Sequence, residues 1–124
     1  METKPEYQVL YDAFIAQYAK GETTPTMAGE VLIRIAGLFP NYNLAMIKAE
    51  RSFSLVKRDE VVKTDEATGK AISATKADTL ADASSDAFVY REAKGHVANI
   101  EMLIGALKFM QKSLEVEYAH SAIS

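Results

Sequence analysis

The chain has 124 residues, of which 48% are hydrophobic and 25% are charged, and its formal net charge is −3. Such a mild charge argues against a global field that would attract nucleic acid or a membrane surface. The absence of cysteine excludes disulfides and thiolate metal sites, and it favours the cytoplasm. We expect one helical domain over residues 1–124, which would gain burial from self-association because small chains have a high surface-to-volume ratio.

The sequence predicts no membrane association. The first residues lack a basic segment followed by an apolar run, so no secretory signal is expected. The most apolar window, residues 31–47, is interrupted by Arg34 and Pro40 and is too short to span a bilayer. We therefore expect a cytoplasmic protein.

A first helix is predicted over about residues 4–20. Thr3 can cap its start, with Glu6 completing a capping box, and Gly21 ends it. Its apolar residues recur at helical spacing and predict one buried face: Tyr7, Leu10, Tyr11, Phe14, Ile15 and Tyr18. Aromatic residues in this row could also stack on bases, but a core or oligomer interface is the preferred interpretation.

Two further helices are predicted over about residues 25–39 and 42–63. Thr24 and Pro25 form a start signal, and Pro40 is expected to stop or kink the helix there. Four residues mark the expected apolar side of the second of these helices, with Met46 and Phe53 flanking it: Leu44, Ile47, Leu55 and Val56. The segment 61–73 contains a polar loop, for which a plain helix–helix connection is the preferred interpretation and a short β-hairpin extension is the alternative.

The C-terminal third predicts one long helix, over about residues 74–119, with Ser73 or Thr75 as its cap. A helix of that length exceeds the width of a compact domain of this size, so it must break, project or pack beside another long helix. Its second half carries a wide apolar stripe in which Leu107 and Leu114 are core candidates. A flanking row that repeats every seven residues supplies the interface candidates: Met102, Phe109 and Val116.

These elements predict an all-α fold in which two short N-terminal helices pack on a long antiparallel helical hairpin, a four-helix arrangement. The hairpin would join the helices over about 42–63 and 74–119. With its turn near Thr68, Arg58 would lie opposite Asp78, and Arg51 opposite Asp86.

No pattern in the sequence predicts a catalytic, cofactor or metal site. Asp78, Asp82 and Asp86 share one face of the expected long helix and could offer oxygen ligands to a hard cation, but pairing with bases of the neighbouring helix is preferred. Glu92 and His96 lack the Glu-x-x-His spacing of di-metal bundles. We therefore expect no enzyme.

Basic residues concentrate between positions 48 and 76 and could contact phosphates. The nucleic-acid or nucleotide candidates are Lys48, Arg51, Lys57 and Arg58. Acidic residues are interleaved with them, so a solvated, ion-paired face is the preferred interpretation and nucleic-acid binding is the alternative.

Two segments, Gly-Lys-Ala-Ile-Ser-Ala-Thr-Lys-Ala-Asp at 69–78 and Asn-Ile-Glu-Met-Leu-Ile-Gly-Ala-Leu-Lys at 99–108, resemble small helical proteins encoded by bacteriophages, many without assigned function. The resemblance covers about the C-terminal half and transfers no functional residue. It implies a phage accessory role, such as binding a host or replication protein, in the host cytoplasm.

Taken together, the sequence predicts a non-enzymatic helical interaction protein that acts by self-association, binding of a partner protein, or both. A homo-oligomer is expected, and the alternative is a nucleic-acid- or nucleotide-binding accessory protein that uses the basic segment.

Overall fold

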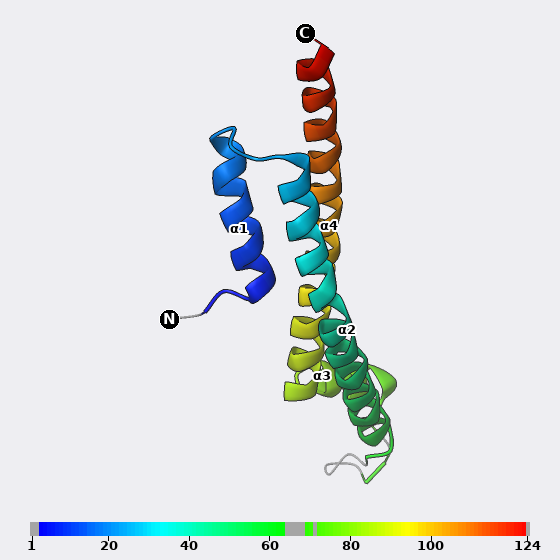
Figure 1. Ribbon diagram of the computed structural model, residues 1–124. Helices are drawn as coiled ribbons and strands as arrows, with labels where there is room; N and C mark the ends of the chain where they lie inside the picture. Colours follow the sequence, from blue (N-terminus) through cyan, green and yellow to red (C-terminus); the bar gives the residue numbers. More distant parts are fainter. Residues whose placement is uncertain (1–2, 64–68, 71, 124) are drawn as a thin grey trace. The chain divides into compact units, whose positions relative to one another are not determined.

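The computed structural model describes residues 3–63, 69–70 and 72–123. Within these ranges the regular structure is entirely helical, which confirms the all-α class. The described residues form four helices (Figure 1): α1 (Glu6–Ala19), α2 (Pro25–Val61), α3 (Ala74–Asp82) and α4 (Ser85–Ile123). Residues 64–68 and 71 of the segment 61–73, for which a β-hairpin is the alternative, lie outside the described residues. At its edges, the Ile72 N–H donates to the Lys63 carbonyl at 3.3 Å.

The expectation of two short N-terminal helices is wrong, because Pro40 lies inside α2 and does not end it. Proline removes one N–H···O=C bond, here to the Ala36 carbonyl, and it costs about 3 kcal/mol in a helix interior. Burial on both sides of the proline offsets this cost, since Ile35 and Ala49 are both buried. The predicted helices at 25–39 and 42–63 are therefore one helix of 37 residues.

The single helix predicted over 74–119 is also wrong, because the chain breaks at Ala83 and Ser84 into α3 and α4. The Ser84 hydroxyl donates to the Ala81 carbonyl at 2.6 Å and accepts from the Ala87 N–H at 3.2 Å, which caps α4. The Arg91 guanidinium donates to the Asp82 carbonyl, a further contact across the break.

Other predicted helix ends are confirmed. The Ser73 hydroxyl accepts from the Lys76 N–H at 3.1 Å at the start of α3, and the Thr24 hydroxyl accepts from the Met27 N–H at 3.2 Å at the start of α2. Gly21 follows the end of α1 with a φ of 71°, a conformation that glycine adopts without steric cost. The capping box at Thr3 is wrong, because the N-cap of α1 is Pro5.

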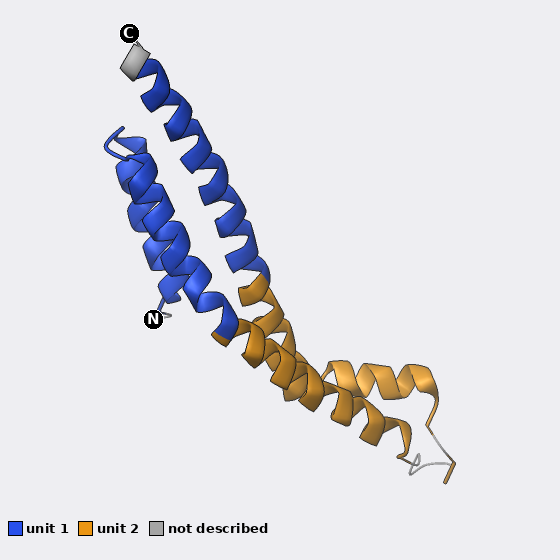
Figure 2. Cartoon of the chain, turned by 45° about the vertical axis from the view of Figure 1, so that its right-hand side comes forward, with its two compact units in different colours: residues 1–40, 98–124 blue, residues 41–97 orange. Residues whose placement is uncertain are grey.

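The chain divides into two compact units (Figure 2): unit 1 comprises residues 1–40 and 98–124, and unit 2 comprises residues 41–97. Within unit 1, the first half of α2 runs beside the second half of α4, and the side chain of Gln111 lies over Gly29. Within unit 2, the second half of α2 runs beside the start of α4, where the rings of Phe53 and Tyr90 lie 5.8 Å apart. The residue earlier in α2, Gly29, contacts the residue later in α4, and the residue later in α2, Phe53, contacts the residue earlier in α4. This order confirms that the two helices run antiparallel.

Unit 1 has a core of large side chains contributed by three helices. Tyr7 and Phe14 of α1 are buried, which confirms the predicted face of that helix. Leu107 and Leu114 of α4 are buried too, as predicted for core candidates. The other buried apolar residues of unit 1 are Ala28, Ile35, Ile100, Leu103 and Met110.

Unit 2 has a thinner core, which packs alanines around one aromatic ring. Phe53 is buried together with Ala81 of α3 and Ala87 of α4, and Val56 and Tyr90 pack against this cluster. Residues six apart on one continuous helix point about 120° away from each other, so the break at Ser84 allows both alanines to reach Phe53.

The apolar side predicted for residues 42–63 is wrong in most of its members. Leu44, Ile47 and Leu55 are exposed, and Val56 alone is partly buried against the core. The buried side of this half of α2 is formed by Ala49 and Phe53 instead. Small alanines on α3 and α4 allow close approach to this side, and this decides which face of α2 turns inward.

Candidate interaction surface

The three interface candidates lie together on the exposed side of α4 in unit 1. Met102, Phe109 and Val116 are 65%, 74% and 54% exposed. Seven residues complete almost two helical turns, so the three side chains form one row along the helix. Leu103 and Leu107 point the opposite way, into the core. The second half of α4 is therefore apolar on two faces, of which the fold covers one.

Small and polar residues continue this row at alternating spacings of four and three. We define the outer face of α4 by six exposed residues: Ala98, Met102, Gly105, Phe109, Lys112 and Val116. A Cβ placed on Gly105 would meet nothing within 4 Å, so the glycine leaves an open notch between Met102 and Phe109. This alternating spacing is typical of a helix that packs along its length against another helix.

Three charged residues flank the outer face on one side. Glu101, Lys108 and Glu115 are exposed, recur every seven residues, and so follow one edge of the face. None of the three side chains forms an ion pair within the ranges that the structure describes. The opposite edge carries uncharged side chains at the same spacing, Asn99, Ala106 and Ser113.

The four nucleic-acid candidates, Lys48, Arg51, Lys57 and Arg58, are exposed on the unit 2 half of α2. Lys48, Arg51 and Arg58 share one face, since Arg51 and Arg58 follow Lys48 by three and ten residues, and Lys57 lies on the side opposite Lys48. The Lys57 ammonium lies 4.4 Å from the centre of the Phe53 ring, a cation–π contact. Three of these charges thus lie on one face of α2, and the fourth contacts an aromatic ring.

The predicted acidic row is divided by the helix break, with Asp78 and Asp82 on α3 and Asp86 on α4. The expected pairing with bases of the neighbouring helix is wrong, because in the described part of the chain no ion pair joins these carboxylates to Arg51 or Arg58. A hollow of ≈ 330 Å³ lies between the second half of α2 and the start of α4, and Lys48 and Asp86 line it.

His96 is partly buried in unit 2, with its ring 5.2 Å from that of Tyr42 and its Nε2 atom 3.9 Å from the Glu92 carboxylate. Among the residues that the structure describes, no group of three or more histidine, aspartate or glutamate side chains could hold a metal ion. None of the described helices has a stretch long and apolar enough to cross a membrane. A second hollow, of ≈ 260 Å³ in unit 1, is lined in part by Tyr18 and Tyr118.

Comparison with known proteins adds no relative: no protein-family model, curated protein or solved structure matches the chain. The interpretation of the surface therefore depends on its own geometry.

Sequence reasoning found the exposed apolar row of α4 but missed the residues that complete its face. Ala98 and Gly105 continue the spacing of the row. Glu101 and Lys108 lie along one edge of the face. The sequence shows this face as a second row of residues with alternating spacings of four and three. This row is displaced by two residues from the row that forms the core.

Proposed function

We propose that this chain is a non-enzymatic helical interaction protein that acts through self-association or binding of a partner protein on the outer face of α4. The observation that carries the proposal is the exposure of Met102, Phe109 and Val116 in one row. Covering one large apolar side chain contributes about 1.5–3 kcal/mol, so covering this row favours association. Contiguous apolar patches on small folded proteins mark interaction surfaces.

Two further features support the proposal. The resemblance of residues 69–78 and 99–108 to phage-encoded helical proteins fits an accessory role in a host cytoplasm, where binding another protein is the expected activity. The acidic residues interleaved with the basic ones of the 48–76 segment count against the nucleic-acid alternative, since they reduce the local positive charge that a phosphate backbone needs.

The test is the mass in solution, measured by light scattering on a sizing column at low and high salt. We expect the wild type to exceed the monomer mass of 13.6 kDa, with no loss at high salt because the contact is apolar. Phe109→Asp should return the chain to a monomer and leave its helix content, measured by circular dichroism, unchanged. Ile33→Asp is the matched control, since Ile33 is 70% exposed and belongs to α2 and not to the outer face of α4.

An unchanged mass for Phe109→Asp would contradict the proposed surface, as would equal effects of Phe109→Asp and Ile33→Asp. Binding of an oligonucleotide that weakens steeply with salt, without any effect of Phe109→Asp, would favour the alternative function instead.

A further inference from the structure

The charges that edge the outer face of α4 identify what covers it. In a helix pair, residues beside the apolar seam face one another across the two chains, and their signs select partner and orientation. Glu101 and Lys108 occupy the same edge, seven residues or about 10 Å apart along the axis, too far to pair within their own helix. Both are exposed and form no ion pair in the described ranges.

An antiparallel second copy satisfies both charges at once. When two identical helices pack antiparallel, each edge of one faces the same edge of the other, and residue numbers rise on one chain as they fall on the other. A two-fold axis beside Gly105 then places Glu101 of each copy opposite Lys108 of the other. The same register places Met102 of each copy beside Phe109 of the other.

Gly105 suits the position on the axis. Its missing Cβ leaves open space on the outer face, where the two helix backbones would approach most closely. The large side chains on either side of it, Met102 and Phe109, then pack above and below the crossing point. A two-fold interface must be self-complementary, and this face is so in both shape and charge.

We infer that the outer face of α4 binds a second copy of this chain in antiparallel orientation, with the two-fold axis beside Gly105 and two reciprocal Glu101–Lys108 ion pairs. The inference rests on the proposed function and deepens it by naming the occupant and its register. A parallel copy would place the charged edge opposite Asn99, Ala106 and Ser113, where neither Glu101 nor Lys108 finds an opposite charge.

Charge reversals test the register directly. Glu101→Lys should weaken dimerisation about tenfold, because the new ammonium of each copy then lies opposite Lys108 of the other, and Lys108→Glu should weaken it similarly. The double variant Glu101→Lys/Lys108→Glu should recover wild-type affinity. An equimolar mixture of the two single variants should form a heterodimer of wild-type strength, since both ion pairs are restored between unlike chains.

Sedimentation equilibrium gives the dimer dissociation constants, and circular dichroism checks that each variant is folded. Glu22→Lys and Lys20→Glu are the matched controls, because they make the same changes of net charge at exposed positions outside the outer face. The effects of the single reversals should shrink at high salt, where charge interactions are screened, and those of Phe109→Asp should persist.

Orientation is tested with Ala119→Cys, an exposed position in a chain without other cysteines. In the antiparallel dimer the two thiols lie about 40 Å apart along the axis and cannot form a disulfide, whereas a parallel dimer would bring them together. A covalent dimer in oxidising buffer would overturn the inference.

Other outcomes separate the inference from the proposed function. If Phe109→Asp abolishes the dimer but the charge reversals and their mixture change nothing, the antiparallel register is wrong and the apolar surface stands. If the wild type is a monomer at every concentration, the second copy is excluded. If Phe109→Asp also leaves the mass unchanged in an oligomeric wild type, the surface itself is refuted.

Discussion

The two units of this chain form their cores in different ways. Four large residues of unit 1, Tyr7, Ile35, Ile100 and Leu107, are essentially inaccessible to solvent. In unit 2 the fully buried positions are alanines, and Phe53 is the one large side chain of the buried cluster. A buried methyl group contributes about 0.8 kcal/mol, against about 1.5–3 kcal/mol for a large apolar side chain.

This difference indicates where the stability of the chain is concentrated. Unit 1 is stabilised by many large buried side chains, so that the loss of one such side chain leaves the remaining ones packed against each other. Unit 2 depends on the close approach of backbones around one ring, and regions with few buried apolar contacts open locally at lower free energy. We therefore expect amides of α3 to exchange with solvent faster than those of residues 100–114 in α4.

Phe53→Ala should have the largest effect. Removing a buried phenylalanine destabilises by roughly 3–5 kcal/mol, and Phe53 is the one large side chain of this buried cluster. Amide hydrogen exchange should show α3 and the start of α4 losing protection, while residues 100–114 keep it. Phe88→Ala, in the same unit but 63% exposed, is the control and should change stability by less than about 0.5 kcal/mol.

Equal loss of protection in both units of Phe53→Ala would contradict the comparison. It would instead indicate that the chain unfolds as one cooperative domain, as the sequence predicts for residues 1–124.

Ser84→Ala should have an intermediate effect, again confined to unit 2. The substitution removes the hydroxyl that caps α4 and contacts the Ala81 carbonyl, a loss of about 1 kcal/mol. Urea denaturation followed by circular dichroism measures this loss. Ser54→Ala makes the same chemical change at an exposed position inside α2 and should not destabilise. If Ser84→Ala keeps the wild-type free energy of unfolding and the wild-type amide protection of α3, packing alone positions the break between α3 and α4.

Local chemistry predicted those parts of the fold that depend on a few neighbouring residues. Ser73 and Thr24 carry hydroxyls that satisfy helix-start N–H groups, and Gly21 supplies the positive φ that ends α1. The repeat through Leu107 and Leu114 predicted the inner face of α4 in the same way. None of these features requires knowledge of distant parts of the chain.

The errors share one cause, which is that packing across helices overrides local preference. Pro40 is a helix breaker by local rules, yet the burial of Ile35 and Ala49 on either side keeps α2 continuous. The break at Ser84 has no proline or glycine to mark it, and its advantage is that Ala81 and Ala87 both reach Phe53. A pattern within a short window of the sequence contains neither of these packing effects, because both depend on residues of other helices.

The candidate surface lies between these cases. The sequence places Met102, Phe109 and Val116 in one row and Leu107 in another, since spacing alone defines both. The sequence also predicted which row faces the core, with Leu107 and Leu114 as core candidates, and their burial confirms this. It does not show which helices cover that side of α4, because this depends on the buried faces of α1 and α2.

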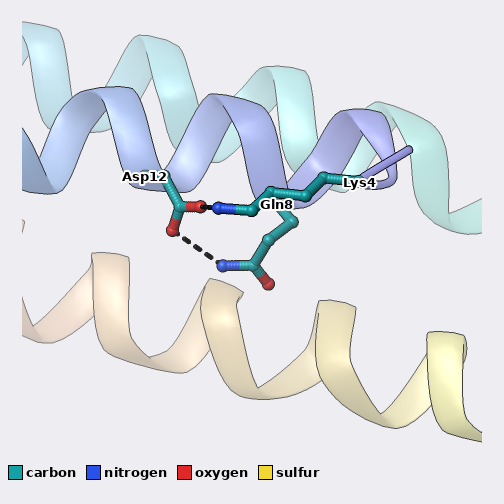
Figure 3. A network of polar contacts seen from close by, with 3 residues as sticks. All are labelled: Lys4, Gln8 and Asp12. Carbon is teal, nitrogen blue, oxygen red and sulfur yellow. Dashed lines mark hydrogen bonds and ion pairs between the residues drawn. The ribbon is translucent and has the colours of Figure 1, made fainter. Parts of the chain in front are cut away.

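The smallest predicted effect concerns an exposed polar network of α1 in unit 1 (Figure 3). The Lys4 ammonium lies 2.9 Å from the Asp12 carboxylate, and the Gln8 side-chain amide donates to it at 2.8 Å. These two hydrogen bonds, that of Lys4 first, lower the pKa of Asp12 below its ordinary value of 3.8. Ionised Asp12 is therefore favoured in the folded state, and Asp12→Asn should remove a small stabilisation.

The sign of the pH dependence follows from the direction of this shift. Because the folded pKa lies below the unfolded value, the stabilisation is fully present above about pH 4 and is lost as the pH falls through the folded pKa. Urea midpoints of wild type and Asp12→Asn should thus differ slightly at neutral pH and converge in acid. The pKa of Asp12 in Lys4→Met, measured by NMR titration, should rise towards its ordinary value. An Asp12 that already titrates at its ordinary value in the wild type would contradict the network.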